Sequence, residues 1–227
     1  TLHGLNLHRD EEFATDNVTE LVRHSRTPFE LDLDESYERR VKTLYAGIVE
    51  FTTRVGDKRV DPDITERVYT LRDVASDIVQ AVKSVKHLRK NVLRYTVRRQ
   101  GATTELYDEL RTELARIAVE IRKLGLTEPE NRSALWLDQE RAQVEDYARM
   151  TSQRVDALIR KGALNATAAT SFMNDSGYAY SAMRDLIEAA RSYYIERDSA
   201  MAKVEELLSL DEEELSEAVI KHANDHG

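Results

Sequence analysis

The feature that most constrains this sequence is one run of apolar residues at helical spacing between Pro62 and Val97. Proline suits the first turn of a helix, and the pattern stops before Gly101. A helix of about 38 residues would be roughly 57 Å long, so this segment predicts a rod. The sequence therefore predicts an all-α protein, an elongated bundle of long helices. The apolar positions that set this prediction are Ile64, Val68, Leu71, Ala75, Ile78, Val82 and Val85.

The same spacing predicts helices along most of the remaining chain. A short helix is expected within 10–25, followed by helices at 35–55, 103–124, 132–161 and from 166 to about 208, with a short acidic helix over 209–227. The predicted stop signals are Gly56 and Gly162, and the candidate N-caps are Asp61, Thr103 or Thr104, Asn165, and Ser209 or Asp211.

Composition excludes several classes of function. A net charge of −9 argues against a general nucleic-acid surface, and the absence of cysteine excludes disulfides, thiolate zinc sites and cysteine nucleophiles. The sequence has no Glu-x-x-His pair, no G-x-S-x-G elbow and no glycine-rich phosphate loop, so a di-iron enzyme, a hydrolase or a nucleotide enzyme is not expected. No apolar run reaches the 18 to 20 residues or so that cross a bilayer. Because the chain starts at Thr1 without methionine, we expect a segment of a longer protein.

The predicted helices fall into three and three, with a long third helix in each set, which indicates an internal repeat. Shifting the sequence by 101 residues places Leu71 on Phe172, Ala81 on Ala182, Val82 on Met183, Val85 on Leu186 and Val92 on Tyr193. In this register Asp73 meets Asn174 and Asp77 meets Tyr178, so "LRDVASDIVQAV" and "FMNDSGYAYSAM" become equivalent.

With these two segments the sequence resembles the PhoU-like family, in which two three-helix bundles each carry an (E/D)xxxD motif on the long third helix. The stretch "FMNDSGYAYSAMRDLIEAA" is most similar to the cytoplasmic C-terminal domain of bacterial sodium/phosphate cotransporter-family proteins. The broad resemblance covers about residues 10 to 208. It implies an N-terminal helix and linker over 1–34, PhoU-like repeats over 35–101 and 102–208, and an acidic C-terminal helix or tail over 209–227.

The resemblance implies a non-enzymatic regulatory or accessory domain in phosphate transport. Its expected partner is a transporter membrane domain or another phosphate-transport protein, with the membrane surface and a second copy in a homodimer as further options and no nucleic acid. The expected location is cytoplasmic, attached to an inner-membrane transporter. Two alternatives stay open, a free-standing regulator of phosphate uptake and a metal-binding helical bundle.

The resemblance also implies a metal site at Asp73 and Asp77, because acidic motifs in PhoU-like proteins hold metal ions. The two carboxylates lie one helical turn apart and could offer oxygens to a divalent or iron-type metal ion. The alternative is a solvated, salt-bridged helix face. The second motif, Asn174, Asp175 and Tyr178, is degenerate: Asn174 and Tyr178 replace both carboxylates of the pattern, so metal is not expected there.

Two further stretches call for an explanation. Residues 83–99 hold seven Lys or Arg at amphipathic spacing, which indicates either an electrostatic surface toward an anionic membrane, an acidic segment or a partner, or simply the outward face of a core helix. "NDSG" at 174–177 places poor helix formers inside a predicted helix. We expect a polar, close-packed turn of helix there, with Gly177 admitting a neighbouring backbone.

Overall fold

The computed structural model describes residues 17–28, 32–56, 62–97 and 101–195, and every element over these residues is helical. The elements are α1 (Val18–His24), α2 (Leu33–Ser36), a π-helical segment η3 (Tyr37–Lys42), α3 (Thr43–Gly56), α4 (Pro62–Val97), α5 (Ala102–Leu126), a 3-10 turn η4 (Pro129–Asn131), α6 (Ala134–Arg160) and α7 (Ala166–Tyr194). The prediction of an all-α fold is confirmed for this part of the chain. None of its helices is long and apolar enough to span a bilayer.

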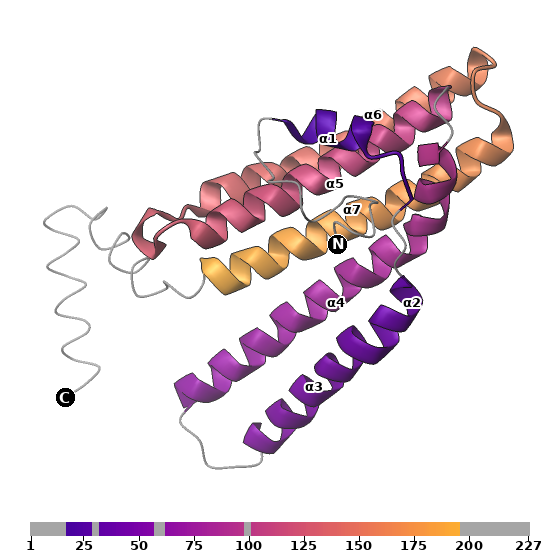
Figure 1. The fold of residues 1–227 in the computed structure, drawn as a ribbon. Helices are drawn as coiled ribbons and strands as arrows, with labels where there is room; N and C mark the ends of the chain where they lie inside the picture. Colours follow the sequence, from indigo (N-terminus) through magenta and orange to yellow (C-terminus); the bar gives the residue numbers. More distant parts are fainter. Residues whose placement is uncertain (1–16, 29–31, 57–61, 98–100, 196–227) are drawn as a thin grey trace, which may run out of the picture.

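The helix α7 is the centre of the molecule, with α5 and α6 on one side and α4 on the other (Figure 1). The helix α3 packs on α4, and α4 runs antiparallel to α7, since Asn91 contacts Asp175 and His87 stacks on Tyr178. The long α4 and α7 are therefore the two elements around which the others are arranged.

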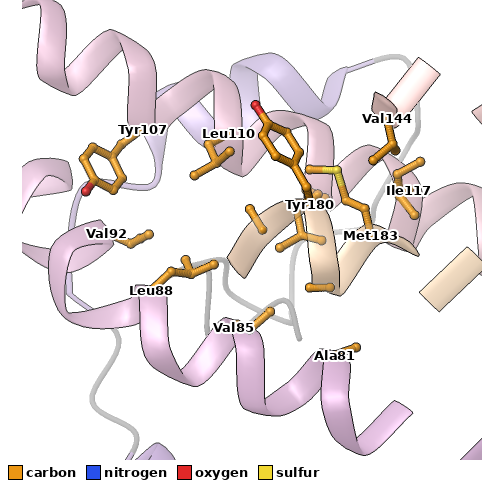
Figure 2. Packing of buried hydrophobic residues seen from close by; sticks show 14 of the residues in the cluster. Ala81, Val85, Leu88, Val92, Tyr107, Leu110, Ile117, Val144, Tyr180 and Met183 are labelled. Atoms are coloured by element: carbon orange, nitrogen blue, oxygen red, sulfur yellow. The ribbon is translucent and has the colours of Figure 1, made fainter. Parts of the chain in front are cut away.

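One continuous core joins α4, α5, α6 and α7 (Figure 2). Its members share a helical spacing on each helix and are almost fully buried. They include Ala81, Val85, Leu88 and Val92 of α4, Tyr107, Leu110, Leu114 and Ile117 of α5, Leu137, Val144 and Val155 of α6, and Phe172, Ala179, Ala182, Met183 and Ile187 of α7. This core holds the C-terminal half of α4 against α7.

Ion pairs between helices reinforce the core at its edges. Arg116 of α5 makes a two-pronged contact with Glu140 of α6 at 2.8 and 2.7 Å, and Glu140 is buried. Arg191 of α7 pairs with Asp138 of α6. The pair of Arg116 with Glu140 constrains both the distance and the orientation between the two side chains, because a guanidinium and a carboxylate form two parallel hydrogen bonds in one plane.

Two predicted helix ends are confirmed and one is wrong. Asn165 caps α7 by accepting a hydrogen bond from Ala168 N at 2.8 Å, and Gly162 follows α6 with φ of 67°, a conformation that glycine adopts without strain. The helix α5 instead begins after Gly101, and the Thr104 hydroxyl is turned toward the carbonyl of Tyr95. The predicted Asp61 cap and the C-terminal helix from Ser209 lie outside the described residues.

The stretch from 33 to 56 is not the uniform helix that its periodicity predicts. A wider π-helical turn replaces the α-helix over 37–42, and the Thr43 hydroxyl reaches back five residues to the carbonyl of Glu38. Lys86 of α4 lies over the Tyr37 ring and also pairs with Asp34, so this one side chain holds both α2 and the start of η3 to α4.

The three-and-three grouping of helices remains a prediction. The helix α1 packs on α5, whereas α3 packs on α4, so the contacts do not gather the elements before residue 101 into one closed bundle. The apolar stripe of α3, which the sequence assigns to a core, is also covered only in part by the described residues: Leu44 is 69% and Val49 38% exposed, and Tyr45 and Ile48 are half-buried. The helix α7 ends at Tyr194, and its predicted extension to 208 lies beyond the described residues.

Candidate functional site

The structure does not bring the two predicted motifs together. Asp73 and Asp77 lie in the N-terminal half of α4. The second motif on α7 faces the C-terminal half of α4, where Asn91 Nδ2 donates to Asp175 at 2.9 Å and the His87 and Tyr178 rings stack with centroids 5.0 Å apart. Because α4 and α7 are antiparallel, motifs that are equivalent in sequence lie at opposite ends of their interface.

The first motif is one part of an acidic face shared by α4 and α7. Burial raises the pKa of Asp77 above its ordinary value, and the charges of Asp185, Glu188 and Asp73 raise it further. Burial likewise raises the pKa of Asp185. Asp73 is exposed and accepts hydrogen bonds from Arg72 of the same turn at 3.1 and 3.0 Å. Over the described residues, no three His, Asp or Glu side chains converge as ligands for a metal ion, so a metal at Asp73 and Asp77 stays a prediction.

That prediction has a direct check by elemental analysis. If the carboxylates of Asp73 and Asp77 hold a cation, metal should accompany the purified protein through dialysis against a weak chelator and should be absent from the Asp73→Ala/Asp77→Ala variant. A control variant, Glu145→Ala/Asp146→Ala on the exposed side of α6, should keep it. Equal metal content in all three proteins, or none in any, would contradict the site.

The second motif is divided between two faces of α7. Asp175 is buried and its Oδ2 accepts from both Asn91 of α4 and the Tyr107 hydroxyl of α5, at 2.9 and 2.5 Å. Asn174 and Tyr178 are exposed. Asp175 therefore joins three helices inside the core. The 101-residue register does not identify this position, because it aligns Asp73 with Asn174, the residue before Asp175.

Asp175 makes the stability of the protein depend on pH. Burial raises its pKa, although the hydrogen bonds from Tyr107 and Asn91 act in the opposite direction. A carboxyl whose pKa is higher in the folded than in the unfolded state destabilises the fold once it is ionised, so this contribution decreases as the pH falls through the raised folded-state pKa and disappears below the ordinary Asp range. We expect Asp175→Asn, which keeps an accepting oxygen, to raise the free energy of unfolding at pH 7 and to lose this gain at about pH 4. Denaturant titrations at several pH values check it, and parallel curves for both proteins would contradict it.

A row of exposed basic side chains runs beside the second motif. Lys83, His87, Lys90 and Arg94 follow one another at four-, three- and four-residue steps on α4, so they share one side of that helix. The stacking of His87 on Tyr178 places the exposed Asn174, Gly177 and Tyr178 of α7 next to this row. We call these seven residues the basic face.

Gly177 does not do what the sequence predicts. The helix α7 continues unbroken through 174–177, and no described residue beyond its own helical turns comes within 4 Å of the place where a Cβ would stand. The prediction that Gly177 admits a neighbouring backbone of the same chain is therefore wrong for the described residues. The position faces open space on the basic face.

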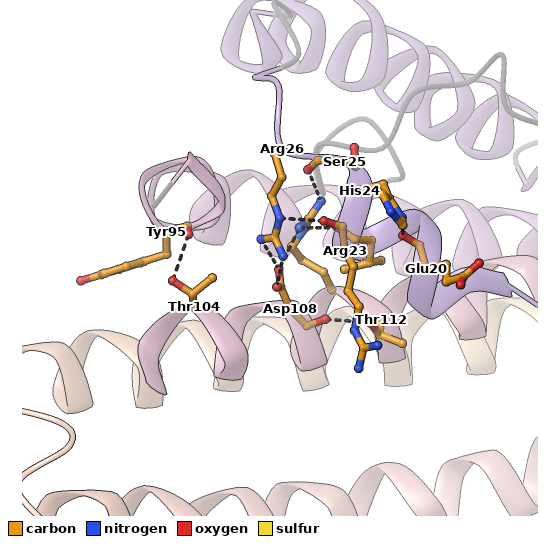
Figure 3. A network of polar contacts seen from close by, with 11 residues as sticks. Glu20, Arg23, His24, Ser25, Arg26, Tyr95, Thr104, Asp108 and Thr112 are labelled. Atoms are coloured by element: carbon orange, nitrogen blue, oxygen red, sulfur yellow. Dashed lines mark hydrogen bonds and ion pairs between the residues drawn. The ribbon is translucent and has the colours of Figure 1, made fainter. Parts of the chain in front are cut away.

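Sequence reasoning missed the group that attaches α1 to the rest of the molecule. Arg111 of α5 is fully buried and donates to the carbonyls of Val22 and Ser25 and to Asp108, at 3.2, 3.1 and 3.1 Å. Arg26 adds a forked contact to Asp108 (Figure 3). Burial lowers the pKa of Arg111 to about 10, so the guanidinium stays charged at neutral pH. One signal was available, because Arg111 stands among Tyr107, Leu110 and Leu114 on an apolar stripe.

An apolar groove of about 970 Å³ lies between α3, α4 and α7. It is bordered by residues 43–52 of α3, 68–78 of α4 and 186–194 of α7, with Ile121 of α5 reaching in. Several of its large side chains are open to solvent: Leu44 is 69%, Phe51 60% and Leu71 45% exposed. We refer to it as the apolar groove.

No protein-family model, curated protein or solved structure matches this chain. The features of the structure that bear on its function are the acidic face, the basic face and the apolar groove.

Proposed function

We propose that this chain is a non-enzymatic, PhoU-like regulatory domain that controls phosphate transport by protein contact, as the cytoplasmic module of a sodium/phosphate symporter-like protein. The observation that carries the contact function is the basic face, and within it Gly177. An exposed glycine inside a helix costs about 1 kcal/mol relative to alanine, and no described part of the chain uses the space it leaves. A partner backbone that comes close to α7 at this point would account for it.

The charges of the basic face define the partner. Lys83, Lys90 and Arg94 form a cationic row on a chain whose net charge is −9, and Tyr178 offers an aromatic surface beside them. Such a row favours an acidic protein surface and speeds the encounter with it. In the proposed setting that surface belongs to the transporter.

The pairing of α4 with α7 supports the PhoU-like part of the proposal. Ala81 and Ala182 occupy the same position in the 101-residue register, and both are fully buried in the core between these helices. If two related helices cross near a local twofold axis, equivalent residues of the two helices lie close to the crossing point. Small residues are needed there so that the helices can approach each other.

The proposal is tested by phosphate uptake in cells that carry the gene. Disrupting the region that encodes this chain should change the uptake of radiolabelled phosphate or its response to external phosphate, and the wild-type sequence should restore it. Lys83→Glu/Lys90→Glu should fail to restore it, as should Gly177→Gln, because the first reverses the charge of the basic face and the second fills the open position.

The matched control is Arg122→Glu/Arg160→Glu, which makes the same change in net charge at exposed positions of α5 and α6. It should restore uptake like the wild type. If disruption leaves phosphate uptake unchanged, the role in phosphate transport is wrong. If the control fails as completely as the basic-face variants, the loss is caused by the change in net charge, and the proposal that the basic face is the contact surface is wrong. Binding of the purified chain to anionic vesicles but to no acidic protein surface would replace the protein partner with a membrane.

A further inference from the structure

The apolar groove has dimensions that correspond to a short helix. Along α7 it extends from Leu186 to Tyr194, a rise of about 12 Å, and along α3 from Thr43 to Thr52, about 13.5 Å. This length accommodates roughly two turns of helix. Its walls are helices whose exposed side chains are mostly apolar, which is the surface that receives the apolar side of an amphipathic helix.

The chain itself continues from one end of this groove. Tyr193 and Tyr194 line it, and the backbone leaves α7 at Ile195, immediately beyond them. Thirty-two residues, 196–227, follow that point. No segment on a separate molecule is held as close, and linkage of this kind raises the effective concentration to the millimolar range.

The sequence beyond Ile195 has the pattern that the groove would select. Met201, Val204 and Leu208 follow at three- and four-residue steps, so in a helix they would share one side, and they span a rise of about 10.5 Å. Asp198 and Ser199, residue types that cap helix N-termini, precede them. Five residues separate Ile195 from Met201, which is within the usual length of a connection between antiparallel helices.

We propose that residues 201–208 of the same chain occupy the apolar groove as an amphipathic helix antiparallel to α7, with Met201, Val204 and Leu208 against Leu44, Phe51 and Leu71. Docking removes from water the apolar side chains that the described residues leave open on α3 and α4. This inference does not depend on the proposed function, because the groove lies at the opposite end of α4 from the basic face.

Two other occupants are available to the groove. Residues 1–16 precede α1 and contain Leu2, Leu5, Leu7 and Phe13, which do not follow one helical stripe. A second copy of the chain could also cover the groove. The three occupants make different predictions for a distance measurement in the chain of residues 1–227.

Because the chain has no cysteine, one nitroxide label can be placed at a single engineered cysteine in the chain of residues 1–227. A label at Ser209→Cys, next to the apolar stripe but outside it, should cause a severalfold loss of amide NMR intensity for residues 43–52 and 68–78. A label at Arg160→Cys, at the end of α6, should leave those signals unchanged. Adding Val204→Asp/Leu208→Asp should restore the lost intensities, whereas Lys203→Asp, which changes the net charge by the same amount on the opposite side, should not.

Each other result overturns the proposal. Loss of groove signals from a label at His8→Cys, and not from position 209, would assign the groove to residues 1–16. Loss that appears only when labelled chains are mixed with isotope-enriched, unlabelled chains would assign it to a second copy. Unchanged groove signals with the label at 209 would show that residues 201–208 do not dock there.

Discussion

Arg111→Met should lower the free energy of unfolding by about 3–5 kcal/mol, which is the usual loss when one partner of a buried charged pair is removed. Arg111 is fully buried and is the donor for two carbonyls at the C-terminal end of α1, as well as a partner of Asp108. Methionine fills most of the volume but leaves those acceptors without this donor. The loss is measured by denaturant titration, and hydrogen exchange should show that α1 loses protection before α5 does.

The control for this prediction lies about three turns further along α5, beyond the part that α1 covers. Arg122→Met changes the same residue type on the same helix α5, but at an exposed position, and should alter stability by less than about 0.5 kcal/mol. Similar losses for both variants would show that the charge of α5 matters and not the attachment of α1. Unchanged exchange from α1 in Arg111→Met would mean that Arg26 and Asp108 suffice to hold it.

Phe172→Ala should also cost about 3–5 kcal/mol, since it opens a cavity in the core. Phe172 is 1% exposed and packs edge-on against the Tyr107 ring, whose centroid is 5.2 Å away. Met173→Ala, at the exposed neighbouring position, is the matched control and should change stability little. Thermal or chemical denaturation of both variants measures the difference, and equal effects would mean that α7 is rotated from the orientation described here.

The helices themselves were predictable, because their periodicity is local. The run from Pro62 to Val97 and the cap at Asn165 follow from residues that are neighbours in sequence. What covers a helix is not local. Leu71 and Leu88 repeat in the same pattern on α4, yet Leu88 is buried by the core and Leu71 is half exposed on the groove. The periodicity of a sequence predicts that a helix has an apolar stripe. Which part of that stripe is buried depends on how the other helices pack against it.

For the candidate sites too, the sequence predicted the local motifs but not how their side chains are packed. The sequence pointed to Asp73, Asp77 and the stretch around Asn174, but the carboxylate that joins three helices is Asp175. A helix turns by about 100° per residue, so adjacent positions in one motif face the core and the solvent. Arg111 was missed for a related reason: a charged residue is normally expected outside, and its buried partners, the end of α1 and Asp108, could not be foreseen without the fold.

The distribution of buried side chains along α4 has a consequence for how the molecule opens. Ala81, Val85, Leu88 and Val92 anchor the second half of this 36-residue helix, whereas over its described first half Val74 is the one buried apolar side chain. Local unfolding free energy follows such differences in burial. The first half of α4 and α3 should therefore melt as a separate cooperative unit while the remainder keeps its native exchange rates. This local reaction would unfold and refold one end of the molecule without opening the core between α4, α5, α6 and α7.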